Sequence, residues 1–172
     1  MKSKEAIQQL MEQSWLRPLA LQHCPFISKM KTPPTAMFFT EVTVRIPTEE
    51  VTRFGKPKPQ RRRFDAIALV KPHFKAYGDD LFALGIEVKV SKSDLSGDMK
   101  FTDYLAYCDY FAFAVPTELL AEARRKIHDR PAVGLINAHT GEWEVMPKQL
   151  EMTPECATEL YRQLAFSARL VH

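Results

Sequence analysis

Cysteine is scarce in this sequence, and long apolar runs are absent. The 172 residues include three cysteines, widely spaced and without a C-x-x-C pair: Cys24, Cys108 and Cys156. An odd, scattered set argues against a disulfide framework or a zinc cluster and predicts buried free thiols in a reducing compartment. No apolar run approaches the roughly 20 residues that span a bilayer. The polar N-terminal stretch MKSKEAIQQLMEQSW is not patterned as a secretory signal, so we expect a cytoplasmic protein with no membrane partner.

Several catalytic signatures are also missing. The sequence has no G-x-x-x-x-G-K-[ST], no G-x-G-x-x-G and no G-x-S-x-G, which argues against a phosphate-loop NTPase, a dinucleotide-binding protein and an esterase-type hydrolase. The five histidines show no H-x-x-x-H spacing, so a zinc hydrolase is not expected. Hydrophobic residues make up 45% and charged residues 26%, the balance of a globular chain, and the length predicts one domain.

Positive charge is concentrated in one segment. The whole chain carries a formal charge of +3. Between residues 45 and 63, seven basic residues stand against Glu49 and Glu50, a local balance of +5, whereas residues 142–159 carry five glutamates against Lys148, a balance of −4. The basic run is either a solvated loop or a surface for a polyanion such as DNA.

Apolar periodicity predicts an α/β chain. Ser3 is expected to cap a first helix that Pro18 closes, and Gly97 is expected to split or bend the helical segment after residue 91. Because a strand, a helix and a buried strand form a right-handed parallel crossover, the sheet should be mixed, antiparallel in its N-terminal half and parallel at its centre. The expected helices are 3–16, 91–108, 117–128 and Pro154 to about Leu170; the expected strands are 37–46, 62–70, 81–90, 109–115, PAVGLINA and EWEVM, with a long mobile loop over 47–60.

Three ionisable residues stand within these strands. Asp65 lies in RRFDAIALV, and Glu87 and Lys89 share one face of GIEVKV because residues two apart in a strand project together. Antiparallel pairing can bring Asp65 opposite that pair. Two converging carboxylates can hold Mg²⁺, and a neighbouring lysine can orient water or stabilise a phosphate. The alternative is structural: a Glu87–Lys89 ion pair, with Asp65 satisfied by nearby arginines.

The order of helix, strand, strand with Asp, strand with E-x-K, helix and strand resembles the restriction-endonuclease-like PD-(D/E)XK nuclease superfamily. More closely, RRFDAIAL followed by GIEVKVSKSDLSGDMKFTDYLAYCDYFAFAVP resembles the MmcB-like family of DNA-repair proteins. The resemblance implies one domain over 1–172 with a three-layer α/β/α fold around a central mixed sheet, and a basic hairpin insertion at about 47–60. It also implies DNA hydrolysis with Mg²⁺ or Mn²⁺: Asp65, Glu87 and the Val88 carbonyl would bind the metal, and Lys89 would be the catalytic lysine.

Further positions carry over from the resemblance. Glu41 in FFTEVTV matches an acidic residue of the first strand and can complete the acidic cluster, or it is an exposed strand glutamate. Asp98, Lys100 and Tyr104 match the family's helix motif. Lys100 and Tyr104 share one helix face, which can border the metal site and touch a phosphate; the alternative is a core tyrosine and a surface lysine. The chain departs from the family pattern at Phe64, Phe101 and the insertion. The expected DNA-binding residues are Lys56, Lys58, Arg61, Arg62, Arg63, Lys100 and Tyr104.

The leading hypothesis is therefore a metal-dependent DNA endonuclease or repair nuclease, for which a homodimer is compatible with the resemblance. The alternative is a DNA-binding or assembly module that keeps the fold without cutting. A third is that the three-residue cluster is only structural. We expect the Asp65 and Glu87 carboxylates to lie within about 4–6 Å of each other, the range at which like charges perturb each other's titration. Side chains on opposite faces of the sheet would exclude a nuclease.

Overall fold

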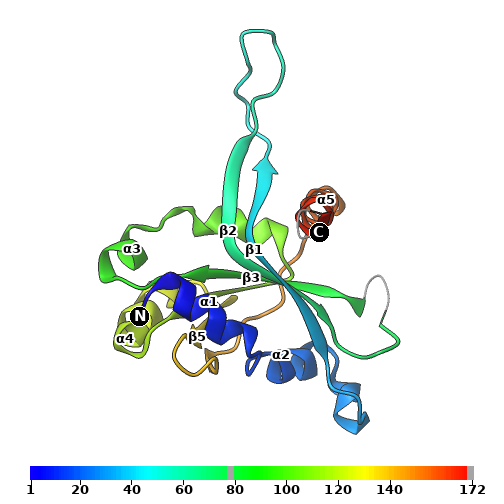
Figure 1. Ribbon diagram of the computed structural model, residues 1–172. Coiled ribbons are helices and arrows are strands. Elements are labelled where there is room, and N and C mark those ends of the chain that lie inside the picture. Colours follow the sequence, from blue (N-terminus) through cyan, green and yellow to red (C-terminus); the bar gives the residue numbers. More distant parts are fainter. Residues whose placement is uncertain (77–79, 170–172) are drawn as a thin grey trace.

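A computed structural model describes residues 1–76 and 80–169. Six strands form a single mixed sheet in chain order (Figure 1). The first three strands pair antiparallel, β3, β4 and β5 run parallel, and β6 is antiparallel to β5. This arrangement confirms the predicted mixed α/β sheet. The strands are β1 (Thr35–Ile46), β2 (Gln60–Lys71), β3 (Phe82–Val88), β4 (Tyr110–Val115), β5 (Val133–Asn137) and β6 (Trp143–Val145).

Helices cover both faces of the sheet. Alternate residues of β4 enter two separate cores: Phe111 and Phe113 face one cluster, and Ala112 and Ala114 face the other. Strands β3 and β4 are buried along their whole length, as expected for strands enclosed on both sides. Helices α1 (Ser3–Met11) and α2 (Leu16–His23) cover the second cluster; α3 (Lys92–Gly97), the 3₁₀ helix η3 (Lys100–Tyr107), α4 (Leu120–Ile127) and α5 (Pro154–Arg169) contribute to the first.

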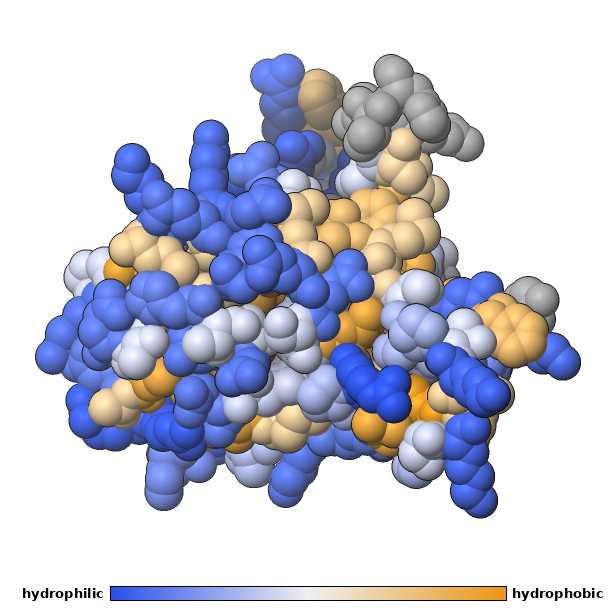
Figure 2. Space-filling view, turned by 60° about the horizontal axis from the view of Figure 1, so that its bottom comes forward, coloured by the Kyte–Doolittle hydropathy of each residue, from blue (hydrophilic) through white to orange (hydrophobic). Residues whose placement is uncertain are grey.

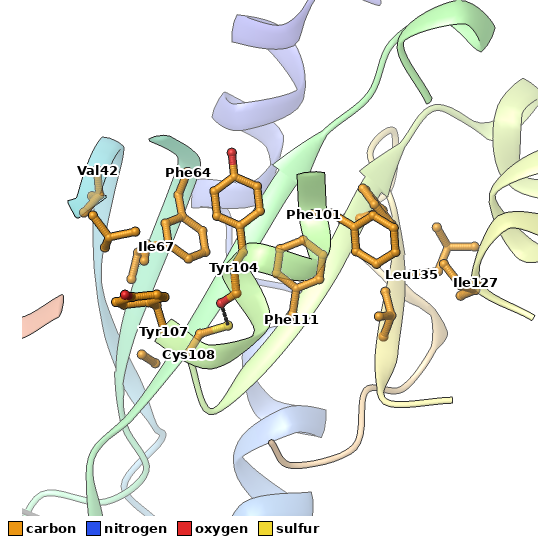
Figure 3. Close-up of a cluster of buried hydrophobic side chains, with 14 of the residues drawn as sticks. Val42, Phe64, Ile67, Phe101, Tyr104, Tyr107, Cys108, Phe111, Ile127 and Leu135 are labelled. Carbon is orange, nitrogen blue, oxygen red and sulfur yellow. Dashed lines mark hydrogen bonds between the residues drawn. The ribbon is translucent and has the colours of Figure 1, made fainter. Parts of the chain in front are cut away.

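Aromatic rings fill the core beneath η3. The Phe64 and Tyr104 rings lie 4.5 Å apart between centroids, and Phe111 stacks on Tyr104 at 6.1 Å (Figure 3). The Phe64 ring passes directly over Gly85, where an added Cβ would lie only 2.6 Å from Phe64 Cε1. The core therefore requires glycine at this position of β3. Phe101, where the family resemblance has tryptophan, is buried in the same cluster.

The sequence-based boundaries differ from the structure mainly at the ends of helices. The expected helix 3–16 is two helices, because the chain turns at Gln13 with φ 62 and restarts at Leu16. Pro18 was predicted to end a helix, but it lies in the first turn of α2. A proline is tolerated there because its missing N–H has no partner within the helix. Lys2, rather than Ser3, is the N-cap of α1, and its N–H donates to Glu5 Oε2.

Other helix predictions are confirmed. Gly97 ends α3 before the separate η3, and Ser91 caps α3 by accepting a hydrogen bond from Asp94 N–H. Helix α5 begins at Pro154, whereas its expected end at Leu170 lies outside the described residues. The remaining 3₁₀ turns are η1 (Pro25–Lys29) and η4 (Thr117–Leu119).

The hairpin between β1 and β2 extends well beyond the body of the molecule (Figure 1). We call residues 45–61 the arm. Its tip is a hydrogen-bonded hairpin: Val51 forms a β-bridge with Pro57, and Thr52 N–H donates to Lys56 O at 2.7 Å. Gly55, with φ 71, makes the turn. The predicted insertion is thus an ordered two-stranded projection.

The three cysteines are free thiols, of which Cys24 and Cys108 are buried. Most of the face drawn in Figure 2 is hydrophilic, and its hydrophobic residues form several groups, the broadest in the upper part of the view. Within residues 1–76 and 80–169, no helix combines the length and apolar character required to cross a bilayer.

Candidate active site

The two acidic residues predicted to converge lie together at the boundary between β2 and β3. The pairing of Ala66 with Ile86 sets the register that brings Asp65 opposite Glu87. Each carboxylate then accepts a hydrogen bond from the neighbouring strand: Glu87 Oε1 from Asp65 N–H at 3.3 Å, and Asp65 Oδ2 from Val88 N–H at 2.8 Å. The sheet therefore does not separate the two carboxylates.

Burial makes this carboxylate pair electrostatically unusual. Glu87 is only 4% exposed. Desolvation, followed by the charge of Asp65, raises the pKa of Glu87 from 4.5 to about 7. Desolvation also raises the pKa of Asp65, although the hydrogen bond from Val88 and the charge of Lys89 oppose it. Glu87 is buried and Asp65 half-buried, and a pair of neighbouring carboxylates whose ionised forms are disfavoured is a site that a bound cation would stabilise.

Lys89 lies beside this pair in a cage of acidic groups. Its Nζ lies 3.2 Å from Glu87 Oε2, 2.9 Å from Asp98 Oδ2 and 3.8 Å from Asp94 Oδ1. Burial lowers the pKa of Lys89, but the hydrogen bond to Asp98 and the charges of the three acids outweigh it and raise that pKa above the ordinary lysine value. Lys89 is therefore a fixed cation at neutral pH.

Asp98 contacts Lys89, and the sequence did not predict this contact. The sequence placed Asp98 in a helix motif, whereas the structure makes it the C-cap of α3, with a side chain only 11% exposed and bonded to Lys89. An aspartate directly after a helix-ending glycine, close in sequence to a lysine that follows a buried strand, was the available signal. Its backbone turn also lets Asp98 Oδ1 accept a hydrogen bond from Lys100 N–H at 3.0 Å.

A cleft of about 330 Å³ opens beside these groups. Lys100 and Tyr104, predicted to border the site, both line it, and Lys100 is exposed. The Tyr104 hydroxyl donates to Arg63 O at 3.0 Å, and burial, with the charge of Glu87, raises the pKa of Tyr104 to about 12. The cleft is lined by Glu87, Lys89, Ser93, Asp94, Gly97, Asp98, Lys100 and Tyr104.

Glu41 does not join the carboxylate pair. It has a left-handed backbone, with φ 55, and a side chain 71% exposed that pairs with Arg63 at 3.5 Å. Its position agrees with the alternative of an exposed strand glutamate. In the part of the chain that the structure describes, no group of three or more His, Cys, Asp or Glu residues could hold a metal. The metal-ligand role of the Val88 carbonyl remains a prediction.

The basic run divides into residues with different partners. Arg62 forms an ion pair with the body of the molecule. Its Nε lies 2.7 Å from Asp103 Oδ2 in η3, and only 14% of its side chain is exposed. Arg61 is exposed, and Arg63 lies close enough to Asp65 for its charge to lower the pKa of that carboxyl. Lys56 and Lys58 are exposed and lie beside the turn at Gly55, at the tip of the arm, and neither lines the cleft.

Comparison with known proteins supports the class of fold and goes no further. The strand order and the helices on both faces define an α/β protein with a mixed sheet. The chain is similar in structure to the SPO1766 protein of unknown function from Silicibacter pomeroyi, with 22% identity, a TM-score of 0.53, and coverage of 78% of this chain and 75% of that one. No family model and no curated protein matches the sequence.

Proposed function

We propose that the protein is a metal-dependent DNA endonuclease with a restriction-endonuclease-like PD-(D/E)XK fold. The observation that carries the proposal is the reciprocal hydrogen bonding of Asp65 and Glu87 across adjacent strands, with the Lys89 ammonium 3.2 Å from Glu87. A sheet rarely buries two acids and a lysine side by side unless a compensating function retains them. The family resemblance of the same three residues supports the proposal.

The donor set fits Mg²⁺ or Mn²⁺. Mg²⁺ is commonly bound through one or two carboxylates, with water and phosphate oxygens completing its coordination. Asp65 and Glu87 would hold the ion, since desolvation disfavours the ionised form of both neighbouring carboxyls and a cation beside them would offset it. When bound, the ion would polarise the scissile phosphate and lower the pKa of a coordinated water.

Lys89 supplies positive charge at a fixed point of the cleft. Because its ammonium is tied to Asp98 at 2.9 Å and its pKa is raised, it remains protonated. A protonated lysine cannot accept the proton of an attacking water, so its role in this proposal is to orient that water or to stabilise charge developing on the phosphate. Asp98 acts through Lys89 and is a positioning residue.

A cleavage assay tests the proposal. Supercoiled, branched and single-stranded DNA are incubated with Mg²⁺ or Mn²⁺, using the wild-type chain, Lys89→Ala and the matched control Lys92→Ala. Lys92 is exposed and pairs with Glu122, so it serves as a nearby lysine outside the carboxylate cluster. We expect cutting by wild type and Lys92→Ala and loss of at least about a hundredfold in Lys89→Ala. A melting curve for each variant verifies that it is folded.

Two outcomes would contradict the proposal. Cutting by Lys89→Ala at the wild-type rate would remove the lysine from the reaction. Binding of DNA by the wild type with no cutting of any substrate by either metal would favour a DNA-binding or assembly module on the same fold.

A further inference from the structure

The tip of the arm presents an aromatic side chain to solvent. Phe54 is 73% exposed and Val51 is 63% exposed. The backbone that carries them is ordered by hydrogen bonds from Gly55 N–H to Thr52 O at 2.9 Å and from Lys58 N–H to Glu50 O at 2.8 Å. A large apolar group held out at the end of a structured projection gains nothing from folding, because it buries little surface there.

One cation lies against this aromatic ring, and further basic residues follow along the arm. The Arg53 guanidinium lies 4.7 Å from the Phe54 ring centroid, and Lys56 is exposed two residues later. At the base of the arm, Arg45 and Arg61 are direct partners in the β1–β2 ladder. Neither side chain pairs with an acidic group in the described residues.

The Arg45–Arg61 pair is itself evidence for an anionic ligand. Directly opposite residues in a sheet have Cβ atoms roughly 5 Å apart, and like charges in that position destabilise the hairpin. A phosphate between or beside the two guanidiniums would remove the repulsion. A DNA backbone supplies phosphates at regular spacing along an elongated element such as this arm.

We propose that the arm binds DNA with its arginines on the phosphate backbone and with Phe54 stacked on an unpaired base. The substrate class is accordingly DNA that contains unpaired bases, such as forks, gaps or bubbles. This inference rests on the proposed nuclease function for the place of cutting, but the binding by the arm is independent of catalysis. Aromatic stacking is tolerant of base identity and needs a base free of its neighbours.

Geometry limits how far the unpaired region lies from the cut. Phe54 and Asp65 are eleven positions apart, which corresponds to at most roughly 35 Å at about 3.3 Å per residue. This is the length of about ten base pairs, or one turn of duplex. A membrane partner is less consistent with the arm, because two apolar side chains bury little area and the basic residues extend from the tip to Arg45 and Arg61 at the base.

Fluorescence anisotropy with the full chain in EDTA tests the arm without cutting. The probes are a fully paired duplex and a bubble-containing duplex of the same length and flanking sequence. Phe54→Ala is compared with wild type and with Phe74→Ala, a matched control that is 56% exposed and has Lys75 Nζ 5.4 Å from its ring centroid. We expect Phe54→Ala to weaken bubble binding roughly tenfold and duplex binding less than twofold, with no change in Phe74→Ala.

Arg61→Gln is measured in the same assay. We expect it to weaken binding to both probes by a similar factor, because phosphate contacts do not distinguish the two DNAs. Equal effects of Phe54→Ala on both probes, or no effect, would overturn the inference. So would Phe54-dependent binding to phosphatidylserine vesicles without binding to either DNA. Phe54-dependent bubble binding without cleavage under any condition would support the inference about the arm and refute the nuclease proposal. Cleavage by the wild type, together with bubble binding by Phe54→Ala that equals wild-type binding, would support the nuclease proposal and refute the inference about the arm.

Discussion

The free energy of unfolding of the metal-free protein should fall as the pH rises, because Glu87 loses a proton that the fold favours. Its carboxyl has a pKa of 4.5 in an unfolded chain and about 7 in the folded protein. Between these values the folded protein retains the proton while the unfolded chain has released it. Stability from this group is therefore fully present below pH 4.5 and declines until about pH 7, by roughly 3 kcal/mol in total.

Urea unfolding in EDTA at several pH values between 4.5 and 8 measures this change. Other groups titrate in the same window: burial lowers the pKa of His23, so that histidine adds stability as the pH rises. The informative quantity is the difference between wild type and Glu87→Gln, which keeps the shape and removes the titration. We expect that difference to change by roughly 3 kcal/mol across the window, in favour of the variant at high pH.

Two results would refute this reasoning. Parallel pH profiles for wild type and Glu87→Gln would mean that Glu87 titrates normally and that burial beside Asp65 does not perturb it. A wild-type stability that rises relative to the variant with pH would mean that Lys89 overcompensates the carboxylate pair. Adding Mg²⁺ at pH 8 should restore stability to wild type and not to Glu87→Gln, because ionised carboxylates bind the ion.

Three further predictions concern neighbouring features. Asp98→Asn should lower the rate of DNA cutting about tenfold or more at unchanged KM, and shift the basic limb of the pH–rate profile downward, as steady-state kinetics will show. Gly85→Ala should lower the free energy of unfolding by about 1–3 kcal/mol in urea, since its Cβ would meet the buried Phe64 ring at 2.6 Å; an unchanged midpoint would contradict this. In DNA titrations at several salt concentrations, Arg61→Gln should reduce the slope of log K against log salt by about one and Arg62→Gln should leave it unchanged.

Those elements that depend on local patterning were predictable. Alternation in the strands and the turn residues between them were sufficient to bring Asp65 opposite Glu87 and to place Lys89 on the same side as Glu87. The break in the helical segment at Gly97 followed from the poor helix propensity of glycine. These inferences needed only the period of a strand and the conformational preferences of single residues.

Features set by contacts between distant segments were not predictable. The approach of Asp98 to Lys89 depends on how the chain leaves α3, and the commitment of Arg62 to Asp103 depends on where η3 crosses the sheet. The left-handed backbone of Glu41 has no sequence signal in a stretch rich in strand-forming residues, yet it accompanies an exposed side chain and an ion pair with Arg63. Tertiary packing decides each of these cases.

The arm shows why a count of charges along a sequence overestimates the number of basic side chains that a ligand can contact. In the β1–β2 ladder Arg62 pairs with Val44, which is fully buried, so its side chain turns toward the body and is neutralised there. Arg61 lies on the other side and faces Arg45 across the hairpin. That like-charged pair weakens the free arm; Arg45 lines a cavity with Glu155 and Glu159, and a bound anion would stabilise the pair further. Charge held at a cost to the fold is therefore a better guide to a binding surface than the larger charge of the whole run.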